Sequence, residues 1–136
     1  MSIVDGSPAG ASSSPMLGRA VDPNEYGRLD VFEVDRPVTV TFVTEELQAL
    51  CPAVEGIQPD IYRATISYIA DTHAIESKSL KLMLTTYRDQ RIFAEHLVGE
   101  LADRIAHASP GIRDVTVTLL QNARGGITTE VTASPR

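Results

Sequence analysis

The sequence predicts an α+β fold in which two helices cover one face of a four-stranded antiparallel sheet. Three observations predict it: the order strand, strand, helix, helix, strand, strand; the short connections between sequential strands; and a length of 136 residues, which suits one domain. Hydrophobic residues make up 43% of the chain and charged residues 22%, which is the composition of an ordinary globular domain.

Period-two alternation of β-branched and aromatic residues predicts the strands. The four expected strands are residues 38–43, 61–69, 115–119 and 127–131. The side chains expected on one face of the second strand are Tyr62, Ala64, Ile66 and Tyr68. Residues 50–60 carry two prolines and a glycine, so we expect them to form a loop that Asp60 closes.

Apolar residues at helical spacing predict the two helices. The first is expected from Ser77 to about Tyr87, and its apolar face consists of Leu80, Met83, Leu84 and Tyr87. The second has an apolar stripe that repeats every four residues, at Phe93, Leu97, Leu101 and Ile105. Residues 109–111 (SPG) are expected to stop this second helix.

The composition excludes several functional classes. Twelve basic and eighteen acidic residues give a net charge of −6, so the chain lacks the basic excess that non-specific nucleic-acid binding needs. No run of about 18 apolar residues and no secretory signal are visible, so we expect no membrane span and a cytoplasmic location. The single cysteine, Cys51, excludes an internal disulfide and a multi-cysteine zinc site.

Residues 1–28 and 29–136 differ in composition. The first segment is rich in Ser, Gly, Pro and Ala and buries too little apolar area to offset its ordering entropy, so we predict a flexible tail. The expected helices and strands all lie in the second segment, which we predict to be the folded domain. Open sheet edges and an aromatic content of only 5% favour association into a homo-oligomer.

Cys51 is the first candidate for chemistry. A thiolate is a strong nucleophile when it is accessible and its pKa is lowered. Asp60, at the other end of the same loop, could donate a proton near the sulfur. The alternative is that Cys51 is a small buried hydrophobe and that the Pro-Asp pair serves only the turn.

Residues 76–81 (ESKSLK) form the most informative stretch. The chain has ten arginines but only two lysines, Lys78 and Lys81, which lie three residues apart and therefore share one helical face. Ser77 is expected to cap free amides at the helix start. A helix N-terminus with two ammonium groups suits a phosphate, and a solvated, capped helix start is the alternative.

The remaining candidates lie further along the chain. Arg124 precedes two glycines, and the missing side chain at Gly125 lets a ligand approach the backbone, although a hairpin turn is the alternative. Glu95, in the first turn of the second helix, could accept hydrogen bonds from a purine-like amide and amine, or it could merely interact with the helix dipole. His73 and Glu76 have no third ligand nearby, so no metal is expected.

Several ordered blocks of the sequence carry a resemblance to a known family. They are Leu50-Cys51-Pro52, Gln58-Pro59-Asp60, the strand at 61–69, the helix start at 76–82, Phe93 with Glu95, and Arg124-Gly125-Gly126-Ile127. From about Leu29 to Val131 the chain resembles the NADPH-dependent 7-cyano-7-deazaguanine reductases, the nitrile reductases of queuosine biosynthesis, in their short single-module form. The resemblance implies the tunnelling fold, pentameric rings paired into a decamer, and active sites between subunits.

The resemblance also implies a role for each candidate residue. Cys51 resembles the nucleophile that attacks the nitrile carbon to form a thioimide, and Asp60 resembles the acid that protonates the nitrogen. The residues implied to bind the deazaguanine are Ile75, Glu76, Ser77 and Glu95. Those implied to contact NADPH are Lys78, Lys81, Arg124 and Gly125. Two hydride deliveries from NADPH would convert the nitrile of this small-molecule substrate to 7-aminomethyl-7-deazaguanine.

Two features depart from the family pattern. The connection from Cys51 to Asp60 is two residues longer than the usual spacing, and Ala94 stands where the family has a histidine before Glu95. These departures keep two alternatives open: a non-redox relative that forms an amidine at the same nitrile, and a non-catalytic protein that binds deazapurines.

Overall fold

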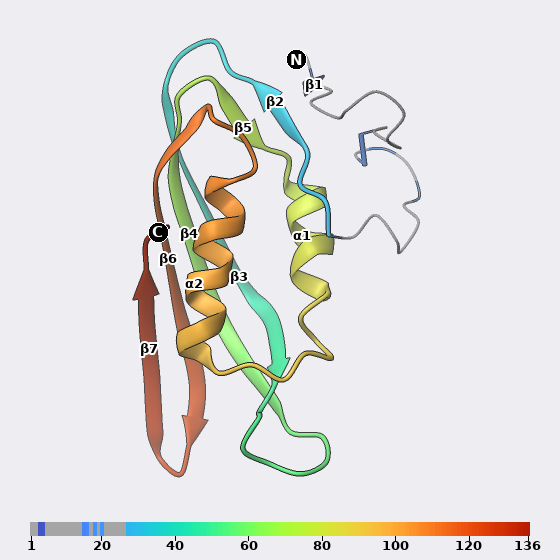
Figure 1. Ribbon diagram of the computed structural model, residues 1–136, viewed down its shortest axis with the longest axis vertical. Helices are drawn as coiled ribbons and strands as arrows, with labels where there is room; N and C mark the ends of the chain where they lie inside the picture. The colour runs from blue at the N-terminus through green and yellow to red at the C-terminus, as the bar shows by residue number, and fades with distance from the viewer. Residues whose placement is uncertain (1–2, 5–14, 17, 19, 21–26) are drawn as a thin grey trace.

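Two helices lie on one face of a four-stranded antiparallel sheet in the computed structural model (Figure 1). The structure describes residues 3–4, 15–16, 18, 20 and 27–136. Its elements in chain order are β1 (Ile3–Val4), β2 (Val31–Glu33), β3 (Val38–Leu50), β4 (Pro59–Ala70), β5 (His73–Ile75), α1 (Ser77–Thr85), α2 (Ala94–Ala106), β6 (Ile112–Arg124) and β7 (Ile127–Ala133). The large sheet has the order β3-β4-β6-β7, so the expected fold class is confirmed.

A second, smaller sheet was not predicted. It has the order β1-β2-β5, and its β2–β5 ladder pairs Val31 with Ile75 and Phe32 with Ala74. Strands of two or three residues are too short to show alternation, so only the approach of distant segments reveals them. This sheet leads directly into α1 and therefore fixes where that helix begins.

The predicted flexible tail, residues 1–28, lies mostly outside the described residues. Among those that are described, Ile3–Val4 pair with β2. Met16 is fully buried, and its amide donates to the Asp30 carboxylate at 2.8 Å. These two segments thus make contacts with the folded part of the chain.

Strands β3 and β6 are longer than predicted, whereas α1 is shorter. β3 continues to Leu50 and β6 spans residues 112–124, because polar residues extend a ladder without showing hydrophobic alternation. α1 ends at Thr85, two residues before the predicted end at about Tyr87. Phe93 is the N-cap of α2 and 47% exposed, so it does not belong to the buried stripe as predicted. Neither described helix is long and apolar enough to span a membrane.

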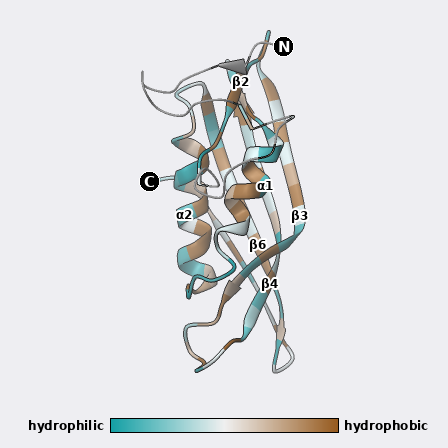
Figure 2. Cartoon of the chain, turned by 90° about the vertical axis from the view of Figure 1, so that its right-hand side faces the viewer, coloured by the Kyte–Doolittle hydropathy of each residue, from teal (hydrophilic) through white to brown (hydrophobic). Residues whose placement is uncertain are grey.

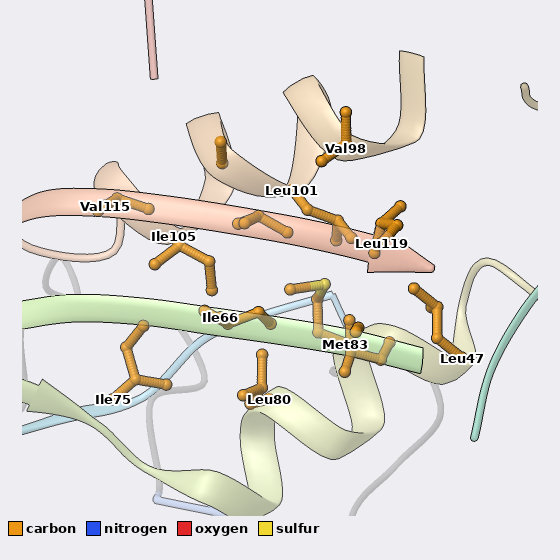
Figure 3. Close-up of a cluster of buried hydrophobic side chains, with 14 of the residues drawn as sticks. Leu47, Ile66, Ile75, Leu80, Met83, Val98, Leu101, Ile105, Val115 and Leu119 are labelled. Atoms are coloured by element: carbon orange, nitrogen blue, oxygen red, sulfur yellow. The ribbon is translucent and has the colours of Figure 1, made fainter. Parts of the chain in front are cut away.

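The core lies between the helices and the large sheet. The four side chains predicted to share one face of β4 do so and are all buried: Tyr62, Ala64, Ile66 and Tyr68. Hydrophobic and hydrophilic residues alternate along the strands in Figure 2, as expected for a sheet with one covered face. Figure 3 shows side chains from α1, α2 and the sheet meeting in one cluster, which includes Leu80, Met83, Leu101, Ile105, Ile66 and Leu119.

A β-bulge decides which face of the sheet carries the end of β3. Thr44 pairs with Ala64 and Leu47 pairs with Tyr62, so β3 uses one more residue than β4 between these pairs. The Thr44 hydroxyl accepts a hydrogen bond from the Glu46 amide at 3.1 Å inside the bulge. Because side chains alternate, this single extra residue turns the odd-numbered positions of β3 after the bulge toward the helices.

Truncation of Leu101 tests the core. Leu101 is fully buried where α2 meets the sheet, so Leu101→Ala should lower the free energy of unfolding by about 2–5 kcal/mol, measured by urea denaturation. Thr128→Ala, at an exposed position of the edge strand β7, should change it by no more than about 0.5 kcal/mol. Equal effects of the two variants would contradict this packing.

Candidate active site

The β3–β4 ladder brings Cys51 and Asp60 to the same face of the sheet. Asp60 pairs with Ala49, and the ladder continues past Leu50, because the Cys51 amide donates to the Gln58 carbonyl at 3.0 Å. Cys51 and Asp60 are therefore diagonal neighbours, and such Cα atoms lie about 7–8 Å apart. The extra length of the connection bulges out at residues 52–57 and does not separate them.

Asp60 is a buried carboxylate with a cationic partner. It is 3% exposed and lies inside β4, so the prediction that it ends a loop is wrong: the loop is confined to residues 51–58. Arg124, at the end of β6, donates from Nη2 to Asp60 Oδ1 at 3.1 Å and also to the Pro59 carbonyl. One edge of the Asp60 carboxylate is thus held by a guanidinium that is itself half exposed.

Arg91 organises the loop behind Cys51, and sequence reasoning missed it. Its guanidinium donates to three loop carbonyls: Cys51 at 3.3 Å, Val54 at 3.1 Å and Gly56 at 2.6 Å. The backbone beside it is clamped to the end of β3, since the Leu50 amide donates to the Gln90 carbonyl at 2.8 Å. Only the tertiary fold places Arg91, forty residues downstream, against this loop.

Tyr62 lies beneath the Cys51–Asp60 pair and is the most unusual side chain of the site. It is fully buried, yet its hydroxyl has no hydrogen-bond partner among the described residues. Burial raises its pKa to about 12, and the charges of Asp60, Glu95 and Cys51 act in the same direction, while Arg124 opposes them. An unpaired buried hydroxyl costs roughly 1–3 kcal/mol, so this arrangement needs a reason.

Glu95 belongs to this same end of the molecule. It lies exposed in the first turn of α2 and is close enough to Tyr62 to raise the pKa of that phenol. We call Cys51, Asp60, Glu95 and Arg124 the thiol–carboxyl cluster. The chain thus joins the predicted nucleophile and acid with one of the two predicted substrate-binding glutamates.

Gly125 forms the tip of the β6–β7 hairpin. Gly125 and Gly126 have positive φ angles of 57° and 79°, which a two-residue turn with the twist of the flanking strands requires. The turn explains both glycines on its own, and the expected cofactor contact at Gly125 remains a prediction.

Glu76, and not Ser77, caps α1, so the sequence-based expectation is wrong on this point. Glu76 has an extended backbone, and its carboxylate accepts from the amides of Lys78 at 2.5 Å and Ser79 at 2.9 Å. Glu76 is 3% exposed, whereas Ser77 is exposed. Binding of a substrate by Glu76 would use the lone pairs that the cap leaves over.

Ile75 precedes this cap in β5 and is buried. Its amide donates to the Tyr68 hydroxyl at 2.8 Å. His73 and Glu76 gain no third partner of metal-ligand type, and the described part of the chain holds no group of three such side chains that could bind a metal.

A groove of about 560 Å³ runs between α1 and β3. Its cationic residues are Lys78 and Lys81 from α1 and Arg88 from the turn that follows this helix. The floor is apolar, with Phe42, Leu47, Ile66, Leu80 and Leu84. The shared face predicted for the two lysines is confirmed. Arg88, three residues after the end of α1, lines the same groove, and sequence reasoning missed it.

The predicted site residues fall into two places within one chain. The Ile75 amide donates a hydrogen bond to the Tyr68 hydroxyl. Tyr68 lies eight residues after Asp60 on β4, so their Cα atoms are about 26 Å apart at 3.3 Å per residue. Residues 75–81 therefore lie toward one end of the sheet and the thiol–carboxyl cluster lies at the other (Figure 1). Arg124 pairs with Asp60 and does not line the groove of Lys78 and Lys81.

Comparison with known proteins shows the family of this chain. Residues 59–136 match the family described as QueF-like protein, which is more than half of the chain. The chain belongs to the QueF-like family. The matched part covers β4 to β7 with both helices, and it contains every predicted site residue except Cys51.

Relatives of known function are similar over most of the chain. An NADPH-dependent 7-cyano-7-deazaguanine reductase of Syntrophus aciditrophicus is 40% identical over 130 residues, covering 93% of this chain and 89% of the relative. A protein of the same name from Chlorobium luteolum is 41% identical over 110 residues, covering 78% of this chain and 91% of the relative.

A solved structure supports the fold. The apo form of an archaeosine synthase described as QueF-Like superimposes with a TM-score of 0.61 at 22% identity, covering 74% of this chain and 94% of that one. Together with the sheet order, this confirms the α+β tunnelling fold for the protomer.

The role of Arg91 can be tested without an activity assay. Arg91→Ala removes the donors to three loop carbonyls, so the Cys51 amide, which is bonded to the Gln58 carbonyl across the base of the loop, should exchange with deuterium at least about tenfold faster, because each lost hydrogen bond contributes about 1 kcal/mol. Arg36→Ala, which loses only an exposed pair with the adjacent Asp35, should leave that exchange unchanged. Unaltered exchange in Arg91→Ala would show that the guanidinium does not hold the loop.

Proposed function

We propose that this protein is an NADPH-dependent 7-cyano-7-deazaguanine reductase, which reduces the nitrile to the aminomethyl group. One observation carries the proposal: a partly exposed thiol and a buried carboxyl group lie on the same face of adjacent strands. It is supported by the name shared by the relatives that are about 40% identical over most of the chain.

Cys51 acts as the nucleophile in this proposal. Its sulfur attacks the nitrile carbon, a carbon–sulfur bond forms as one carbon–nitrogen π bond breaks, and a covalent thioimide results. Covalent capture divides a difficult addition into easier steps. Arg91 helps to hold the Cys51 backbone while the side chain remains reachable.

Asp60 is the proposed proton donor for the nitrile nitrogen. Burial between the sheet and the helices keeps water away from its proton, and the ladder fixes it relative to Cys51. Once Asp60 has given up this proton, Arg124 stands 3.1 Å from the resulting negative charge. Thiol and acid can then act on the two ends of one triple bond.

The groove between α1 and β3 fits a dinucleotide. Lys78, Lys81 and Arg88 provide cations for its phosphates, and the apolar floor suits the flat rings. NADPH supplies, when bound, the hydrides that reduce the carbon. The chain's own residues bind and orient it. Arg124 and Gly125, at the other end of the sheet, would reach the cofactor from a second copy of the chain.

A second copy also completes the substrate pocket in this proposal. Glu95 and the thiol–carboxyl cluster lie at one end of the protomer, whereas Ile75, Glu76 and Ser77 lie toward the other. Two carboxylates that read the deazaguanine edge must therefore come from different subunits. The open edges at β3 and β7 allow such association, and we propose paired pentameric rings in the cytoplasm.

The non-redox and non-catalytic alternatives are not favoured. The relatives at about 40% identity are named as reductases, and the lysines of the groove suit a dinucleotide that a non-redox enzyme would not need. The longer connection does not help the alternatives, because it leaves Cys51 and Asp60 on one face.

The reaction can be tested directly with purified protein. Incubation with 7-cyano-7-deazaguanine should consume about two NADPH per amine formed, followed by absorbance and mass spectrometry. Cys51→Ala and Cys51→Ser should lose both turnover and the intact-mass adduct, because neither variant has the thiolate. An adduct without NADPH oxidation would favour the amidine-forming alternative, and tight binding without an adduct would favour the non-catalytic one.

Substitution in the groove tests the cofactor site. Lys78→Ala and Lys81→Ala should each raise the KM for NADPH by about tenfold or more with a smaller effect on kcat, because an ammonium–phosphate contact mainly contributes binding. Arg36→Ala removes an exposed cation outside the groove and should leave this KM unchanged. An unchanged KM in both lysine variants would refute the assignment.

A further inference from the structure

The buried tyrosines of this chain are not equivalent. Tyr62, Tyr68 and Tyr87 are each at most 1% exposed. The Tyr68 hydroxyl accepts from the Ile75 amide at 2.8 Å, and the Tyr87 hydroxyl accepts from Arg104 at 2.9 Å. The Tyr62 hydroxyl has no partner among the described residues. The fold satisfies two of these phenols and leaves the third one unpaired.

The unpaired hydroxyl lies inside the thiol–carboxyl cluster. Tyr62 is two residues after Asp60 on β4, so both side chains project from the same face of the strand. On β3 it pairs with Leu47, which shares its face with Cys51 after the bulge. The charged and titratable groups around the phenol are Asp60 from β4, Cys51 from the end of β3, Glu95 from α2 and Arg124 from β6.

The phenol is suited to donate and not to lose its proton. Burial raises the pKa of Tyr62 to about 12, so it stays neutral at physiological pH. The neighbouring groups that could accept its hydroxyl proton are acidic. Among them, Asp60 is buried and lies on the same strand. Phenylalanine would fill the same space without burying an unpaired hydroxyl, so the hydroxyl points to a state of the site in which it is used.

We propose that Tyr62 is a positioning residue of the active site, whose hydroxyl donates a hydrogen bond to the Asp60 carboxylate formed during the reaction. The inference rests on the proposed function. As the Cys51 sulfur bonds to the nitrile carbon, the nitrogen takes the proton of Asp60 and leaves a carboxylate behind. Arg124 holds one side of that carboxylate at 3.1 Å, and the Tyr62 hydroxyl would hold another. The hydrogen bond forms as the charge appears and thus favours the transition state over the ground state.

Tyr62→Phe tests this inference because it removes only the hydroxyl. The variant should be at least as stable as the wild type to urea, since no partner is lost. Its rate of thioimide formation and its kcat should fall by about ten- to a hundredfold, and its KM for NADPH should stay the same, because Tyr62 does not line the groove.

Tyr87→Phe is the matched control. It also removes the hydroxyl of a buried tyrosine, but this one is bonded to Arg104 and lies away from the thiol–carboxyl cluster. Tyr87→Phe should therefore lose stability and keep the wild-type kcat, which is the reverse of Tyr62→Phe.

Two results would overturn the inference: wild-type kcat in Tyr62→Phe, or a loss of stability as large as that of Tyr87→Phe. Wild-type protein assayed beside Tyr62→Phe distinguishes a failure of the proposed function from a failure of the role of Tyr62. No turnover by the wild type defeats the proposed function and this inference with it, whereas wild-type turnover with an unimpaired Tyr62→Phe defeats only the role of Tyr62.

Discussion

The backbone ladder between β3 and β4 is the constraint on which the site depends. The amide of Cys51 bonds to the Gln58 carbonyl, and Ala49 faces Asp60, so thiol and carboxyl are set by strand register and not by the loop between them. The bulge after Thr44 adds the one residue that turns Cys51 toward the helices. If the register before the bulge continued, Cys51 would lie opposite Ile57 and on the face of the sheet away from Asp60.

Two arginines support the end of this ladder from different directions. Arg124 reaches across from β6 to the buried Asp60 carboxylate, and Arg91 ties together three carbonyls of the loop that follows Cys51. Each replaces water at backbone or carboxylate oxygens that would otherwise need it. A loop longer than its family usually has can therefore remain ordered beside a reactive group.

The protomer divides the chemistry between its two ends. The thiol–carboxyl cluster lies where β3 ends and β4 begins, whereas the Glu76 cap and the lysine-lined groove lie along α1. A long, thin sheet with open edges joins the two without bringing them together. Such a division favours an assembly in which neighbouring copies bring unlike ends into contact, and it gives a small chain with a limited core a reason to associate.

The sequence by itself determined the fold class and which side chains share a face of β4 and, except for Phe93, of the two helices, because these depend on periodicity. The sequence also made Cys51 the candidate nucleophile from the chemistry of a thiol, and that role remains a prediction. It also placed Lys78 and Lys81 on one face. The small sheet, the Glu76 cap, the bulge, the Arg91 contacts and the unpaired Tyr62 hydroxyl were decided only by tertiary structure. Apart from the Glu76 cap, whose partners Lys78 and Ser79 are local, each of these depends on hydrogen-bond partners or register that are set by segments far apart in the chain and leave no local pattern.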